Sequence, residues 1–344
     1  MGSGILLFFK RIWINAIKMS NWTLFFATTS LILFSSFFIN YLEPDVFTSA
    51  FEGLWWTMTT VVTVGYGDIS PTTVQGKIFA MFLYVIGIGL MTVVIGKIIE
   101  ALSLRKRLKE EGKMKVTATD HIILVNWTNR TRIALQELLH TFKDIHIVIV
   151  DEQLAKIPIL HERVEFVSGD PAVEETLYQA NLLSCKSIMV FAQDGAKKTS
   201  ESDGVTLLIA SVLEQIGNEH NKSIYTICEV LDSKHLKAFE HANVEEFITP
   251  NDTAAHLAAR SMLFNGSSEI IRQLTSHKGY DLYHISKKAE WTTYRDASQY
   301  LASNGAVLVG DGNDISIVSD LDRQISTNAK LFIICDEKTY GAII

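Results

Sequence analysis

The sequence predicts an α-helical membrane domain with two spans, fused to an α/β Rossmann-like domain that ends in a small α+β lobe. Two nearly uncharged apolar stretches of about twenty residues lie within the first hundred positions, long enough to cross a bilayer core. From residue 121 onward, short β-rich runs alternate with helical ones, which is typical of a parallel doubly wound sheet. After residue 278 the pattern changes to short strands around one helix.

Composition and charge agree with a membrane part joined to a water-soluble part. The 344 residues are 48% hydrophobic yet 20% charged, and they leave room for two or three domains. Residues 1–112 carry nine Lys and Arg against seven Asp and Glu, whereas residues 113–344 carry 22 against 31. An acidic soluble part argues against nucleic acid as a partner. Cys185, Cys228 and Cys335 lie far apart in apolar runs, and we expect buried, reduced thiols.

We expect six segments along the chain. They are an interfacial N-terminal segment that lies on membrane lipid (1–20), the two-span domain (21–101), a linker (102–116), a Rossmann-like lobe (117–250), a crossover helix used in dimerisation (251–277) and a C-terminal lobe (278–344).

The spans are predicted at Trp22–Leu42 and at about Ile78–Ile99. Basic residues precede the first span and follow the second, while the connecting segment is mostly acidic. The positive-inside rule then places both termini in the cytoplasm and the connecting segment outside, as in a multi-pass protein of the plasma membrane.

The connecting segment contains the most informative motif. Phe47–Thr60 reads as a helix too short to span, and an irregular stretch follows it. Irregular backbone at membrane depth is tolerated only where it is buried in protein or lines a water-filled path. We therefore expect a re-entrant helix and loop. The loop residues are Thr63, Val64, Gly65, Tyr66, Gly67 and Asp68.

This hexapeptide resembles the selectivity filter of potassium channels, and the resemblance to two-span potassium channels covers residues 22–104. It implies a ring of backbone carbonyls that replaces the hydration shell of K⁺, with ligands from Thr63, Val64, Gly65 and Tyr66. Gly65 and Gly67 allow the alternating φ that points successive carbonyls to one side. Some relatives have Glu behind the filter where this chain has Thr59, which bears on inactivation.

Two aromatic residues, Trp55 and Trp56, precede the filter. We expect both to pack around it with Tyr66; the alternative is a pair of interfacial belt residues.

Three glycines interrupt the second span, at Gly87, Gly89 and Gly96. Glycine lowers the stability of a helix interior and needs a reason. One reason is close helix packing, and the other is a bending point for a gate. The resemblance favours a gating hinge at Gly87, with the other two as further candidates.

The linker Leu102–Lys115 is polar, basic and helix-prone, and it is broken by Gly112. We expect it to pass force from the soluble part to the second span. An internal start at Met114 would produce free copies of the soluble part; the alternative is an ordinary methionine.

The soluble part reads as six strands with helices between them. The expected strands are Ile122–Val125, Ile145–Val150, Val164–Val167, Ser187–Phe191, Ile224–Val230 and Val244–Ile248. With Asp151, the turn Ser168–Pro171 and the run Glu246–Pro250, this part resembles the domain that regulates potassium conductance, called RCK.

The RCK resemblance covers most of residues 120–340. It implies one crossover helix over 251–276, where family members dimerise, and a homotetrameric channel whose RCK domains form a ring. The C-terminal lobe is expected to contain β segments at Tyr280–Ile285, Ala306–Val309, Ile315–Val318 and Leu331–Cys335, with a helix at Thr293–Leu301.

The ligand of this domain is the open question. The fingerprint glycines that let a pyrophosphate approach are replaced by Asn126, Thr128 and Thr131, so NAD is disfavoured and an adenine mononucleotide is retained as an alternative. Asp151 keeps the ribose-binding position, and Asp170 either contacts ligand or caps the next helix.

Two other ligand classes are alternatives. Some RCK relatives bind Ca²⁺, and Glu229 matches one ligand position, but Leu231 stands where a second carboxylate is expected. A cyclic dinucleotide between paired C-terminal lobes is the other alternative.

The sequence therefore favours a potassium-selective, ligand-gated channel with no enzymatic activity. Two hypotheses from other classes are a membrane-anchored regulatory subunit of a potassium transporter and a nucleotide-dependent oxidoreductase. The filter motif argues against the first, because an anchor needs no re-entrant loop. The absent glycine fingerprint argues against the second.

Overall fold

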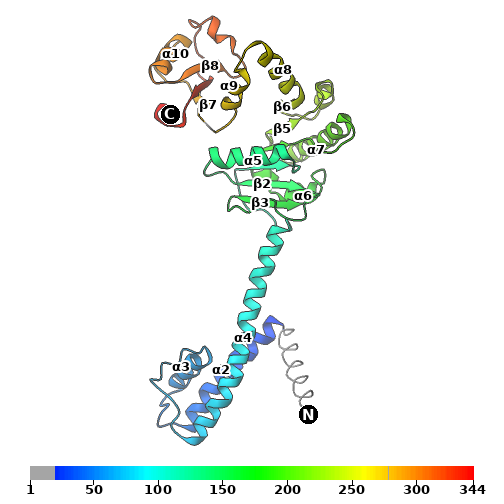
Figure 1. Ribbon diagram of the computed structural model, residues 1–344. Coiled ribbons are helices and arrows are strands. Elements are labelled where there is room, and N and C mark those ends of the chain that lie inside the picture. Colours follow the sequence, from blue (N-terminus) through cyan, green and yellow to red (C-terminus); the bar gives the residue numbers. More distant parts are fainter. Residues whose placement is uncertain (1–19, 278) are drawn as a thin grey trace. The chain divides into compact units, whose positions relative to one another are not determined.

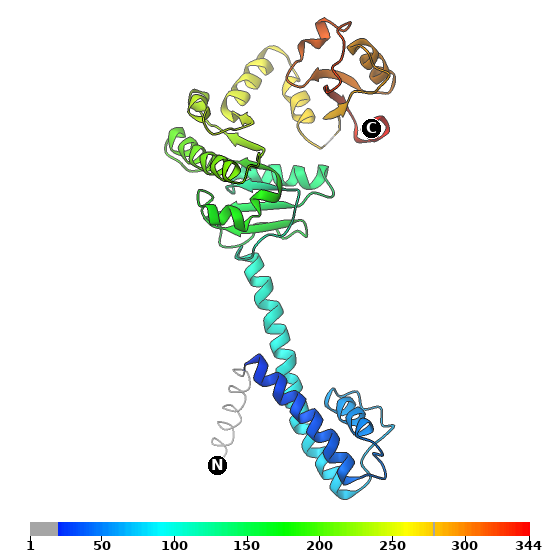
Figure 2. The ribbon, with the colours of Figure 1, turned by 180° about the vertical axis from the view of Figure 1, so that it is seen from behind.

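A computed structural model describes residues 20–277 and 279–344 (Figures 1 and 2). The interfacial segment expected at 1–20 lies almost wholly outside the described residues. The chain divides into two compact units, residues 1–107 and 108–344, and helix α4 continues from the first into the second.

The described part of the first unit contains α2 (Asn21–Leu42), α3 (Ala50–Val61) and most of α4 (Val74–Glu110). Helices α2 and α4 are both long and apolar enough to cross a membrane. The short helix α3 packs against α2, where the Ser36 hydroxyl donates to the Ala50 carbonyl at 2.8 Å. The expected spans and the short helix between them are therefore present.

Glu43 fixes the start of α4. Its carboxylate, only 3% exposed, accepts hydrogen bonds from the backbone N–H and the hydroxyl of both Thr72 and Thr73. The loop after α2 is thereby tied to the residues that begin α4, and four donors compensate for the burial of the charge.

The second unit begins with a six-stranded parallel sheet in the order β3-β2-β1-β4-β5-β6. The strands are β1 (His121–Val125), β2 (Ile147–Asp151), β3 (Val164–Ser168), β4 (Cys185–Val190), β5 (Thr226–Glu229) and β6 (Glu246–Ile248). This is the doubly wound order: β1 to β3 are added toward one edge, and the chain then crosses to β4 on the other side of β1 and continues toward the opposite edge. The Rossmann-like prediction is confirmed.

Helices cover both faces of this sheet (Figures 1 and 2). Leu124 packs with the residues of α5 (Asn129–Thr141) on one face. Its neighbours Ile123 and Val125 pack with α6 (Glu174–Gln179) and α7 (Thr199–Glu219) on the other. Short 3₁₀ turns, η1 (Leu182–Ser184) and η2 (Ser233–Phe239), complete the lobe. The near-continuous apolar strands follow from burial on both faces.

The prediction of one continuous crossover helix is wrong, because the segment is not a single helix. It consists of two helices, α8 (Pro250–Leu263) and α9 (Ser267–Leu274), separated at Gly266 with φ of 91°. The first helix ends at its extended C-cap Phe264, and the left-handed Gly266 then precedes α9 as its N-cap.

The C-terminal lobe is a three-stranded antiparallel sheet in the order β7-β9-β8, with β7 (Asp281–Ser286), β8 (Val307–Asp311) and β9 (Lys330–Cys335). Helices α10 (Tyr294–Ser303) and α11 (Glu337–Ile343) accompany it. The β segment expected at Ile315–Val318 is a 3₁₀ turn, η3 (Ser316–Ser319), because the chain folds back at Asp311–Asp314 and leaves no register for a fourth strand.

Candidate functional site

The filter segment has the backbone geometry that its sequence suggests. Thr63, Gly65 and Gly67 have φ of 62°, 58° and 73°, whereas Val64 and Tyr66 between them do not have positive φ. The N–H groups of Val64 and Gly65 both donate to the Thr59 carbonyl, at 2.8 and 3.1 Å. Because left-handed and ordinary residues alternate, successive carbonyls can turn to the same side of the strand.

An aromatic residue of α3 contacts the C-terminal half of the predicted filter segment. The Trp55 ring lies parallel to that of Tyr66, with centroids 5.7 Å apart, and its indole N–H donates to the Asp68 carboxylate at 2.9 Å. The expectation for Trp56 is wrong, since its ring is buried against Phe47 in the core between the helices. Adjacent positions on a helix point about 100° apart, so only one of the pair can face the filter.

The three hinge candidates of α4, Gly87, Gly89 and Gly96, differ in their surroundings. A Cβ at Gly87 would lie 3.1 Å from a methyl carbon of Val61, the last residue of α3, and Gly87 is buried. A Cβ at Gly89 or Gly96 would meet nothing within 4 Å. The packing explanation therefore accounts for Gly87, while packing within one chain does not account for the other two.

The predicted ligand residues Asn126, Thr128 and Asp151 lie together at the carboxyl edge of the sheet. Asn126 follows β1 with φ of 67°, and its amide donates to the Phe191 carbonyl at 2.7 Å. Thr128 and Thr131 form a reciprocal capping box at the start of α5. This box uses helix N-terminal donors that would otherwise face a phosphate.

The hollow at this edge is small, with a volume of about 60 Å³. Binding pockets for drug-sized ligands typically occupy roughly 300–1,000 Å³. It is lined by Asn126, Trp127, Thr128, Asp151, Glu152, Gln153, Gln193 and Asp194. In this conformation it has no room for a whole dinucleotide.

The two aspartates of this region bind backbone groups. The carboxylate of Asp151 accepts from the N–H groups of Trp127, Gln153 and Leu154 at 2.7 to 2.8 Å. Asp170 accepts from the N–H of Ala172, whereas α6 begins two residues farther on without a side-chain cap. The expected helix cap at Asp170 is therefore wrong; the residue closes a local turn.

Glu229 is paired with a cation that belongs to the chain itself. It is 2% exposed, and its carboxylate accepts from the Arg130 Nε at 2.8 and 3.1 Å and from the Ala192 N–H at 2.8 Å. Burial raises the pKa of Glu229, and the Ala192 N–H and Arg130 partly oppose that increase. The described residues contain no cluster of three or more His, Cys, Asp or Glu placed to hold a metal. Glu229 is not free for Ca²⁺.

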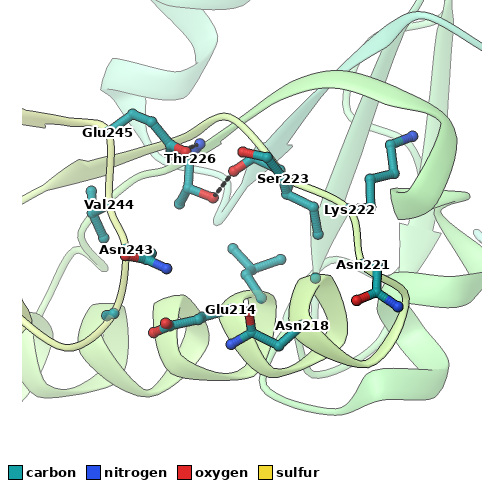
Figure 3. Close-up of a pocket in the computed structure, with 13 residues that line it drawn as sticks. Glu214, Asn218, Asn221, Lys222, Ser223, Thr226, Asn243, Val244 and Glu245 are labelled. Atoms are coloured by element: carbon teal, nitrogen blue, oxygen red, sulfur yellow. Dashed lines mark hydrogen bonds between the residues drawn. The ribbon is translucent and has the colours of Figure 1, made fainter.

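Sequence reasoning missed Arg130, whose role depends on a residue 99 positions away. It also missed a larger hollow of about 540 Å³ at the opposite edge of the sheet (Figure 3). There Asn218, Asn221 and Asn243 line an opening between α7 and the loop before β6. No motif marks these residues.

Linker residues within the second unit are fixed to the RCK fold. The Gly112 carbonyl accepts from the Ser168 N–H at 3.1 Å and from the Gln179 amide at 2.8 Å. Gln179 also donates to the Met114 carbonyl at 3.3 Å, and Lys109 pairs with Glu165 at 2.8 Å.

Comparison with known proteins agrees with this arrangement. Residues 23–103 match the family model described as "Ion channel", and residues 122–250 match the model described as "TrkA-N domain". The chain therefore joins an ion-channel domain to a TrkA-N domain.

Two curated relatives align along most of their length. The "Putative potassium channel protein YugO" of Bacillus subtilis is 29% identical over 81% of this chain and 84% of its own. The "Calcium-gated potassium channel TvoK" of Thermoplasma volcanium is 27% identical over 73% and 72%. The prediction of a two-span potassium channel with a C-terminal RCK domain is confirmed by these matches.

Proposed function

We propose that this protein is a K⁺-selective channel of the plasma membrane, with a homotetrameric pore gated by ligand binding to a ring of RCK domains. The observation that carries the proposal is the alternating φ of the filter segment. This segment follows α3 and lies in the chain between two helices long enough to span a membrane. In it, K⁺ would be held by carbonyls of Thr63, Val64, Gly65 and Tyr66 and by the Thr63 hydroxyl. Gly67 and Asp68 complete the outer end of the filter.

Exposed surfaces support several copies around one pore. In the single chain, Val64 and Tyr66 are 52% and 67% exposed, although irregular backbone at membrane depth must be buried or line water. In the soluble unit, Met262 and Leu263 at the end of α8 are 82% and 77% exposed, and Ile270 on α9 is also exposed. An apolar surface of this kind suits pairing of RCK domains, including any free copies begun at Met114.

Sidedness follows from charge. Arg105, Lys106, Arg107 and Lys109 lie in the C-terminal part of α4, while Glu43 and Asp68 lie in the connecting segment. We infer that both termini are cytoplasmic and that the Asp68 end of the filter faces outward.

The gating ligand must discriminate between open and closed rings, since a ligand with equal affinity for both shifts nothing. The capping box, the small hollow and the paired Glu229 weigh against NAD and against Ca²⁺ at this edge. An adenine mononucleotide that fits after rearrangement, or a cyclic dinucleotide between C-terminal lobes, remains as a ligand class. Thermal shifts of the full-length protein in detergent, with each of these four ligands, would identify a binder.

Flux through liposomes tests the pore. The purified protein should pass K⁺ and exclude Na⁺ without any added partner, and Gly65→Ala should abolish K⁺ flux because φ of 58° disfavours a Cβ. Gly204→Ala, in α7 with open space around the new Cβ, is the matched control. Equal Na⁺ and K⁺ flux would refute the filter assignment.

The alternatives are distinguished by the same preparation. A regulatory subunit of a transporter would conduct nothing by itself. The relatives are channels and not enzymes by name, and we propose no catalytic role for this chain; NAD-dependent turnover would overturn that view.

A further inference from the structure

The guanidinium of Arg130 is surrounded by oxygen atoms from two separate parts of the second unit, the loop after β4 and the end of β5. Its Nε contacts both Glu229 carboxylate oxygens at 2.8 and 3.1 Å. One terminal nitrogen lies 3.0 Å from Asp194 Oδ1, and the other donates to the Ala192 carbonyl at 2.8 Å. Arg130 itself lies in the first turn of α5. One side chain therefore joins α5, the loop after β4 and the end of β5.

Those oxygens are of the kind that divalent cations select. Ca²⁺ is bound by carboxylate and carbonyl oxygens, with water filling the remaining positions. Here two carboxylates and one carbonyl converge on one point, and one of the carboxylates belongs to Glu229, which is 2% exposed. Two anions facing one another need a cation between them, and the chain supplies it as a guanidinium.

A tethered cation differs from a dissolved one in its consequences. A dissolved ion would join the loop after β4 to the end of β5 only when its concentration is high enough, so the junction would report that concentration. The guanidinium is always charged and always present, so the junction is permanently closed.

We propose that Arg130 is a built-in substitute for a divalent cation, and that it makes this junction of the RCK domain insensitive to Ca²⁺. Removing the guanidinium converts the junction into a divalent-cation site formed by Glu229, Asp194 and the Ala192 carbonyl. Only the regulatory meaning of this inference rests on the proposed function; the binding itself does not.

The test compares Arg130→Ser with Arg132→Ser in the full-length protein in detergent. Arg132 lies on the same helix, is exposed, and donates only to the neighbouring Asn129 side chain among the contacts described. Both variants lose one positive charge. Thermal unfolding is measured against CaCl₂ from 0 to about 10 mM at constant ionic strength, since sites with few protein ligands bind at about 0.1–1 mM or weaker.

In the wild type and in Arg132→Ser, Ca²⁺ should not raise Tm through this junction. Any rise in Tm that Ca²⁺ does cause in them should persist when Glu229→Gln is added. Without Ca²⁺, Arg130→Ser should have a lower Tm than the wild type, because a buried carboxylate has lost its partner. Its Tm should then rise with the logarithm of the Ca²⁺ concentration. Arg130→Ser/Glu229→Gln should fold without Ca²⁺ and should not respond to it.

Three results would overturn the inference. They are a wild-type response to Ca²⁺ that depends on Glu229, a folded Arg130→Ser with no response, and an Arg130→Ser that stays unfolded in Ca²⁺ while the double variant folds. Liposome flux is measured separately. A protein that binds as predicted but does not pass K⁺ contradicts the proposed function and leaves this inference standing.

Discussion

Replacing Gly112 by alanine should detach the end of the linker from the RCK domain. Gly112 has φ of 67°, and an added Cβ would lie 2.5 Å from the Ser168 nitrogen and 2.7 Å from a ring carbon of Phe166. Neither group can move aside easily, because one is a backbone nitrogen at the end of β3 and the other belongs to a buried ring. The linker must therefore move away.

The cost follows from the contacts that are lost. A left-handed conformation costs an L-residue roughly 1–2 kcal/mol. The Gly112 carbonyl accepts two hydrogen bonds, from Ser168 and Gln179, and each contributes about 1 kcal/mol. We expect a local destabilisation of about 3–4 kcal/mol.

Hydrogen–deuterium exchange of the full-length protein in detergent measures this opening. Peptides covering 108–116 and 164–181 should exchange about 100- to 1,000-fold faster in Gly112→Ala, because each 1.4 kcal/mol corresponds to a factor of ten. The control is Gly204→Ala in α7, where the new Cβ meets nothing within 4 Å. That change should stabilise by roughly 0.5–1 kcal/mol, the opposite sign.

Unchanged exchange at both peptides in Gly112→Ala would refute the argument. So would an equal acceleration across the whole second unit, since that result means global unfolding and not detachment of the linker. If the linker transmits ligand binding to the pore, flux in Gly112→Ala should also lose its response to any ligand that gates the wild type.

Three further predictions address other parts of the molecule. Trp55→Phe keeps the ring beside the filter but loses the donor to Asp68, so we expect weaker K⁺ over Na⁺ discrimination in liposome flux, and unchanged selectivity would contradict the role of that bond. Gly87→Val should reduce the yield of folded protein by crowding α3, whereas Gly89→Val should not, as measured by size-exclusion profiles in detergent. Burial lowers the pKa of His121 in the folded state below its unfolded value near 6.5. The contribution of His121 to stability is therefore present above that pH and is lost as the pH falls through the folded pKa. His121→Asn should flatten the pH dependence of Tm in thermal unfolding.

The order of the elements could be read from the chain because its signals are local. Runs without charge predicted α2 and α4, and the hexapeptide at 63–68 predicts the position of a filter. Continuous apolar strands indicated a sheet buried on both faces, which the structure has.

The predictions that the structure contradicts concern segments whose residues are compatible with two local structures. Ile315–Val318 is as apolar as a strand but has no partner in the sheet, and it forms a 3₁₀ turn. Trp55 and Trp56 are chemically identical, and only the rotation of α3 decides which of them meets Tyr66. Helices α8 and α9 are separated at Gly266, although the segment contains no proline after Pro250.

The sequence by itself determined that this chain has two spans, a filter motif and a doubly wound soluble domain, because these depend on composition and on neighbours a few residues away. The tertiary structure decided which side chains pair at the carboxyl edge of the sheet and where the linker is bound, because these contacts join residues far apart in the chain. Arg130 meets Glu229 across 99 positions, and the linker at Gly112 meets Ser168 and Gln179 across more than fifty. Such pairs leave no periodic signal, so only the folded chain shows that an arginine stands among the oxygens of this junction.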